Sequence, residues 1–156
     1  MAAFFLYASF PNSRNKPRPA TTSAITYQVT LADFTQPLTL VATATSNRTY
    51  IILKNLDLVN NFWYVYARTL AVNPSIVPTF GVVGDLVYFT GANALYQKQD
   101  VGTTTNWNLV LIQDVGERVE PLQSASLDSP QDIYCATDSA APVVPAVEVG
   151  VDQGTG

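Results

Sequence analysis

The side chains that perform most enzymatic chemistry are sparse in this chain. It contains no histidine, which excludes Ser-His-Asp and Cys-His catalysis and the common histidine-containing zinc sites. A phosphate-binding loop is missing too, because Gly81-Val-Val-Gly84 has neither the required spacing nor the following lysine. We therefore expect a protein that is not an enzyme and that has no catalytic, cofactor-binding or metal-binding residues.

The remaining candidates for reactive chemistry are three carboxylates and one cysteine. Asp114, Glu117 and Glu120 lie close together in the sequence and could hold a calcium ion or act on a glycosidic bond. Asp114 and Glu117 flank Gly116 in a predicted hairpin turn, so we interpret them as solvated turn charges. Cys135 lies in the apolar run Ile133–Ala136, which predicts a buried, unreactive thiol.

The composition predicts a surface with little charge. Charged residues make up 13% of the 156 residues and apolar residues 47%, whereas charged residues are about 25% of an average soluble protein. Long charged side chains lose rotamer entropy when a partner immobilises them, so a surface poor in them favours permanent assembly. A Thr-rich β protein without such a role is the alternative interpretation.

Charge is distributed unevenly along the chain. Residues 1–32 contain Arg14, Lys16 and Arg18 and no acidic residue, and the remaining five basic and twelve acidic residues give a balance of −7. An acidic body argues against a specific nucleic-acid partner, because DNA binding requires basic groups that neutralise phosphates. No run approaches the roughly 18 apolar residues of a membrane-spanning helix, so we also expect no membrane span.

Residues 1–24 are predicted to form an extended N-terminal arm. Pro11, Pro17 and Pro19 exclude both a helix and a central strand. The arm begins with large apolar side chains, which require a surface to receive them. We expect the arm to bind a neighbouring subunit, and its packing on its own domain is the alternative. The predicted partner-binding residues are Phe4, Phe5, Leu6, Tyr7, Phe10, Arg14, Lys16 and Arg18.

The rest of the chain is predicted to form a series of strands, which must position the candidate carboxylates and Cys135. Residues 25–31 alternate apolar and polar side chains, which predicts that Ile25, Tyr27, Val29 and Leu31 share one buried face. The apolar centre of residues 48–54 predicts a strand buried on both faces. Further strands are predicted at 38–42, 62–67, 86–90, 94–99, 107–113, 117–122, 131–136 and 143–151.

These short strands, separated by turns and accompanied by little helix, predict an all-β fold. We expect a single β-sandwich or jelly roll domain over residues 25–152, with a flexible tail at 153–156.

Two consecutive predicted strands carry a more specific pattern. Asn47-Arg-Thr-Tyr-Ile-Ile-Leu-Lys-Asn55 is followed, after a short loop, by Phe62-Trp-Tyr-Val-Tyr66. An Asn-Arg pair before an apolar strand that ends in Asn, followed by an aromatic strand, resembles a segment of small bacteriophage virion structural proteins. The last strands of that family are similar to 116–122, 129–136 and 146–151, and a hairpin of phage fibres resembles 84–88 with 95–107. The resemblance leaves out residues 1–24 and 68–84.

The resemblance implies a structural component of a bacteriophage particle. We expect a minor capsid protein of the decoration, cement or vertex type, located in the virion, which binds capsid proteins and forms a trimer or pentamer. One alternative is a fibre or spike-base adhesin that contacts a host glycan or protein through Tyr96 and Trp107. Another is a noncatalytic carbohydrate-binding module. Exposed aromatic side chains clustered on one concave face would favour the binding alternatives.

Overall fold

The computed structural model describes residues 23–46, 48–74, 81–99, 106–139 and 147–153. Strands dominate this part of the chain, and a single short helix lies among them. The elements are β1 (Ser23–Val29), β2 (Thr39–Ala42), β3 (Arg48–Asn55), β4 (Phe62–Leu70), β5 (Leu86–Phe89), β6 (Ala94–Lys98), β7 (Trp107–Val110), α2 (Ile112–Val115), β8 (Glu117–Val119), β9 (Ser124–Leu127), β10 (Asp132–Thr137) and β11 (Val147–Gln153).

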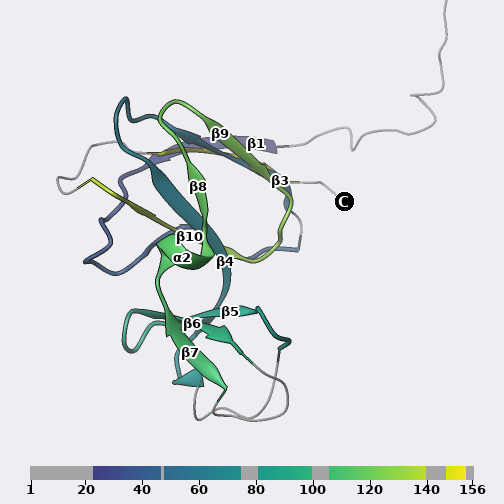
Figure 1. The fold of residues 1–156 in the computed structure, drawn as a ribbon. Helices are drawn as coiled ribbons and strands as arrows, with labels where there is room; N and C mark the ends of the chain where they lie inside the picture. The colour runs from purple at the N-terminus through teal and green to yellow at the C-terminus, as the bar shows by residue number, and fades with distance from the viewer. Residues whose placement is uncertain (1–22, 47, 75–80, 100–105, 140–146, 154–156) are drawn as a thin grey trace, which may run out of the picture.

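Eight of these strands form a jelly roll. One sheet has the order β1-β11-β3-β9, and the facing strands have the order β2-β10-β4-β8, with every pair antiparallel. The chain thus crosses repeatedly between two four-stranded layers, as it does in jelly rolls. Strands β5, β6 and β7 and helix α2 are inserted between β4 and β8, and they extend away from the roll (Figure 1). The predicted all-β fold is confirmed.

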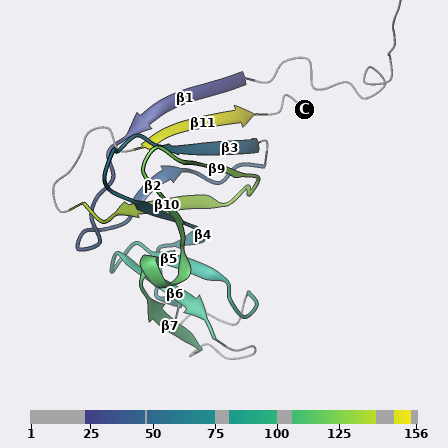
Figure 2. The ribbon, with the colours of Figure 1, turned by 45° about the horizontal axis from the view of Figure 1, so that its top comes forward.

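The core of the roll comes from alternate residues of the two layers. In β3, Ile51 and Leu53 are fully buried, whereas Tyr50 and Ile52 are 37% and 38% exposed. The prediction that residues 48–54 are buried on both faces is therefore wrong. Among the described residues, the outer face of this sheet is not covered by another layer (Figure 2).

Strand β10, unlike β3, is buried on both faces. Ile133 and Cys135 point into the core of the roll, and Tyr134 and Ala136 pack on the opposite side against the insertion. The insertion therefore packs below β10 and β4 (Figure 2), while its β5 is hydrogen-bonded to the end of β4 in the same sheet. The predicted burial of Cys135 is confirmed, and this burial raises the pKa of its thiol, which keeps it neutral.

Strand β1 lies at the edge of its sheet and is only partly covered. Leu31, which follows the strand, is buried, but Ile25 and Tyr27 are 49% and 37% exposed. The prediction that these two side chains are buried is wrong, because among the described residues β1 has a neighbouring strand on one side only, which leaves its side chains open to solvent at the edge of the sheet. β1 also begins at Ser23 and β11 ends at Gln153, so both strands reach slightly into the predicted arm and tail.

The predicted strands at 107–113 and 117–122 are shorter in the structure. β7 ends at Val110 and the chain then forms the single helical turn α2, where a strand and a hairpin turn were expected. β8 ends at Val119, and a turn that holds Leu122 at a positive φ of 62° leads into β9, which was not predicted. Positive φ is unusual for leucine, so its sequence does not indicate this turn.

Candidate functional site

Two turns at one end of the jelly roll hold large apolar side chains in solvent. Leu58 and Val59, between β3 and β4, are 75% and 77% exposed, and Leu122, between β8 and β9, is 56% exposed. We call these three side chains the apolar tip. These exposed side chains add no stability to the isolated domain. Apolar side chains of this size contribute strongly to the free energy of binding when a partner covers them.

Asn55 joins the two turns beneath the apolar tip. Its buried side-chain amide donates hydrogen bonds to the carbonyl oxygens of Asn60 at 2.9 Å and Val119 at 3.1 Å. The side-chain oxygen of Asn55 accepts the backbone N–H of Asp57 at 2.9 Å, and its backbone N–H donates to the carbonyl of Gln123 at 2.9 Å. One buried residue therefore fixes the positions of both turns.

Further hydrogen bonds hold the turn between β3 and β4. The Asp57 carboxylate accepts the backbone N–H groups of Val59 at 2.7 Å and Asn60 at 2.9 Å. These hydrogen bonds keep the pKa of Asp57 below its usual value, and the one from the backbone of Asn60 has the largest effect. Asn61 donates from its backbone and its side chain to Asp138, at 3.0 and 2.9 Å. A turn held in this way loses little entropy when it binds a partner.

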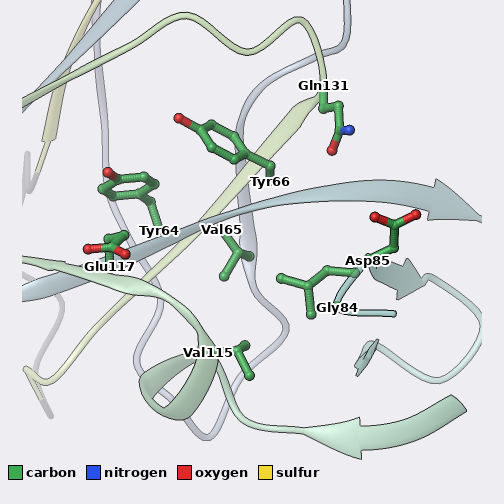
Figure 3. Close-up of a pocket in the computed structure, with 9 residues that line it drawn as sticks. Tyr64, Val65, Tyr66, Gly84, Asp85, Val115, Glu117 and Gln131 are labelled. Atoms are coloured by element: carbon green, nitrogen blue, oxygen red, sulfur yellow. The ribbon is translucent and has the colours of Figure 1, made fainter. Parts of the chain in front are cut away.

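A cleft of about 320 Å³ is a second surface feature, and it lies where the insertion meets the roll (Figure 3). β8 pairs with the beginning of β4 and β5 with its end, and the cleft opens beside the residues between them. The polar and aromatic side chains that line it are Tyr64, Tyr66, Asp85, Glu117 and Gln131.

The cleft offers aromatic rings, an amide and negative charge. Tyr64 and Tyr66 project from the same face of β4, with ring centroids 6.1 Å apart. Desolvation raises the pKa of both phenols, so their hydroxyl groups stay protonated and can donate and accept hydrogen bonds. Glu117 lies beside Tyr64, and Asp85 lies across the cleft (Figure 3). This combination suits a neutral, hydroxyl-rich ligand better than an anion.

Trp107 does not form a surface contact. It is only 3% exposed, and the ammonium group of Lys98 lies 5.3 Å from the centroid of its ring. The prediction for Trp107 is therefore wrong, because β7 turns this side chain toward the interior of the inserted layer. Tyr96 is half-buried in β6, between β5 and β7. The two residues do not form an exposed aromatic surface together.

The residues predicted to bind partners through the arm lie outside the described part of the chain. They are Phe4, Phe5, Leu6, Tyr7, Phe10, Arg14, Lys16 and Arg18.

The three neighbouring carboxylates are distributed over different elements. Asp114 lies in α2, Glu117 begins β8, and Glu120 forms an exposed ion pair of 2.7 Å with Arg118. Within the described ranges, no group of three or more acidic or cysteine side chains is placed to hold a metal ion. Nor does any helix in these ranges have the length and apolar character needed to cross a membrane.

Sequence reasoning missed both the apolar tip and the cleft. The tip had a usable local signal, because Asn55, Asp57, Asn60 and Asn61 surround Leu58 and Val59 with residues that favour turns. The cleft had none, since its side chains come from segments that are distant in the sequence and meet only after folding.

Comparisons of this chain with protein-family models, curated proteins and solved structures find no match. The jelly roll by itself does not decide the function either, because the same architecture occurs in viral capsid proteins and in lectins. The function must therefore be argued from the surface.

Proposed function

We propose that this protein is a noncatalytic structural component of a bacteriophage particle, a minor capsid protein of the decoration, cement or vertex type. It acts in the virion, where it binds capsid neighbours through its N-terminal arm and its β-domain, and it clusters as a trimer or pentamer. The apolar tip carries this proposal, since Leu58 and Val59 are more than 70% exposed on a turn held by internal hydrogen bonds.

Three further observations support a role in assembly. The jelly roll is an architecture of viral capsids, and the low content of charged residues limits the entropy lost when surfaces associate. The rigid turns also place the apolar tip at one end of the roll, from which adjacent subunits could be reached. Central apolar anchors of this kind provide most of the binding energy in protein interfaces.

Substitution of the apolar tip tests the proposal. Leu58→Ser with Val59→Ser should leave the melting temperature nearly unchanged, because both side chains are exposed, and should reduce incorporation into particles at least about tenfold. Incorporation is measured as the amount of the protein per particle after purification of the particles. Leu109→Ser with Leu111→Ser is the matched control, since these side chains are 64% and 56% exposed on the insertion.

Two outcomes would contradict the proposal in different ways. Normal incorporation of the Leu58→Ser, Val59→Ser variant, or loss only in the control, would show that the tip is not the contact. Absence of the unaltered protein from purified particles would reject the role in the virion altogether.

The cleft favours a second candidate function, the binding of a glycan by an adhesin or a carbohydrate-binding module. Tyr64 and Tyr66 could stack on sugar rings, while Gln131, Asp85 and Glu117 could accept or donate hydrogen bonds to hydroxyl groups. The two carboxylates would repel sialylated or sulfated sugars, so a neutral oligosaccharide is the expected ligand.

A glycan array probed with the full chain tests this second candidate. Binding to neutral oligosaccharides that is lost in Tyr66→Ala and retained in Tyr50→Ala would support it, because Tyr50 is an exposed tyrosine outside the cleft. An array without any neutral ligand, or a ligand that both variants still bind, would reject it.

A further inference from the structure

β1 has the longest open strand edge in the part of the chain that the structure describes. It borders the four-stranded sheet and, among the described residues, pairs only with β11, over seven residues in unbroken register. The other bordering strands are shorter, since β2, β7 and β9 have four residues each and β8 has three. Within the described ranges, the outer backbone N–H and C=O groups of β1 face no other strand.

β1 lacks the features by which edge strands resist such pairing. Its sequence Ser-Ala-Ile-Thr-Tyr-Gln-Val contains neither a charged residue nor proline, and its register with β11 has no bulge. Ile25 and Tyr27 are partly exposed on the side that continues the core. The hydroxyl of Tyr27 donates to the carbonyl of Val41 in β2, which holds the ring in place. An added strand would cover both side chains.

We propose that β1 pairs antiparallel with β1 of a second copy of this chain, around a two-fold axis at Thr26. The two four-stranded sheets then form one continuous sheet. Ile25 lies opposite Tyr27 of the second copy on the core side, and aromatic residues opposite β-branched residues are favourable cross-strand pairs. On the outer side, Thr26 lies opposite Thr26 of the second copy, which is also a favourable pair.

The charges beside β1 permit this arrangement. Glu148 and Asp152 of β11 lie opposite Gln28 and Ala24 of β1. In the proposed sheet, Glu148 of one copy and Asp152 of the second copy lie on the same line across the strands, with the two β1 strands between them. At about 4.8 Å per strand, the backbone positions of these two residues are roughly 14 Å apart, which exceeds the screening length of about 8 Å at physiological salt. Lys54 of β3 lies opposite Glu148 on the other side of β11 and reduces the repulsion further.

A second β1 fits this edge better than the segment that precedes it in the same chain. To pair with β1 through a short hairpin, that segment would have to turn back directly, and the stretch that would then lie beside the strand contains Pro17 and Pro19. Proline has no N–H to donate to a sheet. β1 itself has a donor at every position. A two-fold contact of this kind adds to any cyclic cluster that forms through another surface.

Cysteine substitution in the full chain tests the register. Thr26→Cys places two thiols opposite each other at the axis, and mild oxidation should give a disulfide-linked dimer. Gln28→Cys is the matched control, because two residues at position 28 are four positions apart along the strands, roughly 13 Å, which is too far for a disulfide. The native Cys135 is buried and does not contribute.

Light scattering over a series of concentrations tests the contact itself. Thr26→Lys brings two ammonium groups together and should weaken the dimer at least about tenfold, whereas Thr26→Val should preserve it. Removal of residues 1–19 should also leave the dimer intact.

Equal cross-linking at positions 26 and 28, or a monomer at every concentration, would overturn the proposal. Loss of the dimer on removal of residues 1–19 would overturn it as well, and would assign the edge to the arm. These measurements use the purified chain without particles, so their outcome is independent of the proposed role in the virion.

Discussion

Arg48 illustrates how single buried polar residues organise this fold. Its guanidinium donates to the carbonyl oxygens of Thr43 at 2.8 Å, Ser129 at 2.6 Å and Gln131 at 2.6 Å. These acceptors belong to the connection between β2 and β3 and to the connection between β9 and β10. The Arg of the Asn-Arg pair therefore has a structural role at the end of the roll opposite the apolar tip.

Replacement of Arg48 should destabilise the domain strongly. Arg48→Ala leaves three carbonyl groups without their charged donor and should lower the free energy of unfolding by about 2–4 kcal/mol. Arg118→Ala is the control, since it removes an exposed ion pair with Glu120 and should cost no more than about 1 kcal/mol. Urea denaturation measures both values, and equal effects of the two substitutions would contradict the role assigned to Arg48.

Asp57 should make the turn beneath the apolar tip sensitive to acid. The backbone N–H groups of Asn60 and Val59 lower the pKa of its carboxylate in the folded state below its usual value. The stabilisation is therefore fully present above about pH 5 and is lost as the pH falls through the folded pKa. The difference in melting temperature between the native protein and Asp57→Asn should shrink between pH 6 and pH 3. A difference that is constant with pH would contradict this explanation.

At the scale of elements, Gly116 determines how α2 and β8 approach β4. A Cβ atom at this position would lie 2.7 Å from the carbonyl oxygen of Ile112 and 2.8 Å from that of Tyr64. Both are backbone atoms, which yield only if the elements separate. Gly150 in β11 has no atom within 4 Å of the same position. The two glycines therefore differ in the space around them.

The contrast between these glycines predicts opposite responses to alanine. Gly116→Ala should lower the free energy of unfolding by about 1–3 kcal/mol, since α2 or β8 must move. Gly150→Ala should change it by less than about 0.5 kcal/mol. Thermal unfolding of both variants checks the expectation, and a tolerated Gly116→Ala would show that the contact between α2, β8 and β4 is loose.

At the scale of the whole molecule, the described strands and cores begin well after the N-terminus. β1 begins at Ser23, and the described residues of both hydrophobic cores lie from Leu31 onward, with Val29 packed against one of them. Removal of residues 1–19 should therefore shift the melting temperature by less than about 4 °C, the shift that about 1 kcal/mol produces in a domain of this size. Incorporation into particles should be lost if the arm binds capsid neighbours. Unfolding of the shortened chain would place the arm in the core of its own domain.

Much of the fold follows from local patterns in the sequence. Alternation with a period of two marks β1 and β2, and Asn, Asp, Gly and Pro mark most turns between strands, because these preferences depend on a few neighbouring residues. The missing histidine and the acidic balance after residue 32 are likewise properties of the sequence alone.

Only the tertiary structure decides which apolar faces are covered. Ile52 and Tyr134 both lie in apolar strands, yet Ile52 is exposed and Tyr134 is buried beneath the insertion. The cleft and the joining of two turns by Asn55 likewise depend on residues that are distant in the sequence. Alternation tells which side chains share a face of a strand, but the layer that packs on that face is determined by strand pairing across the whole chain.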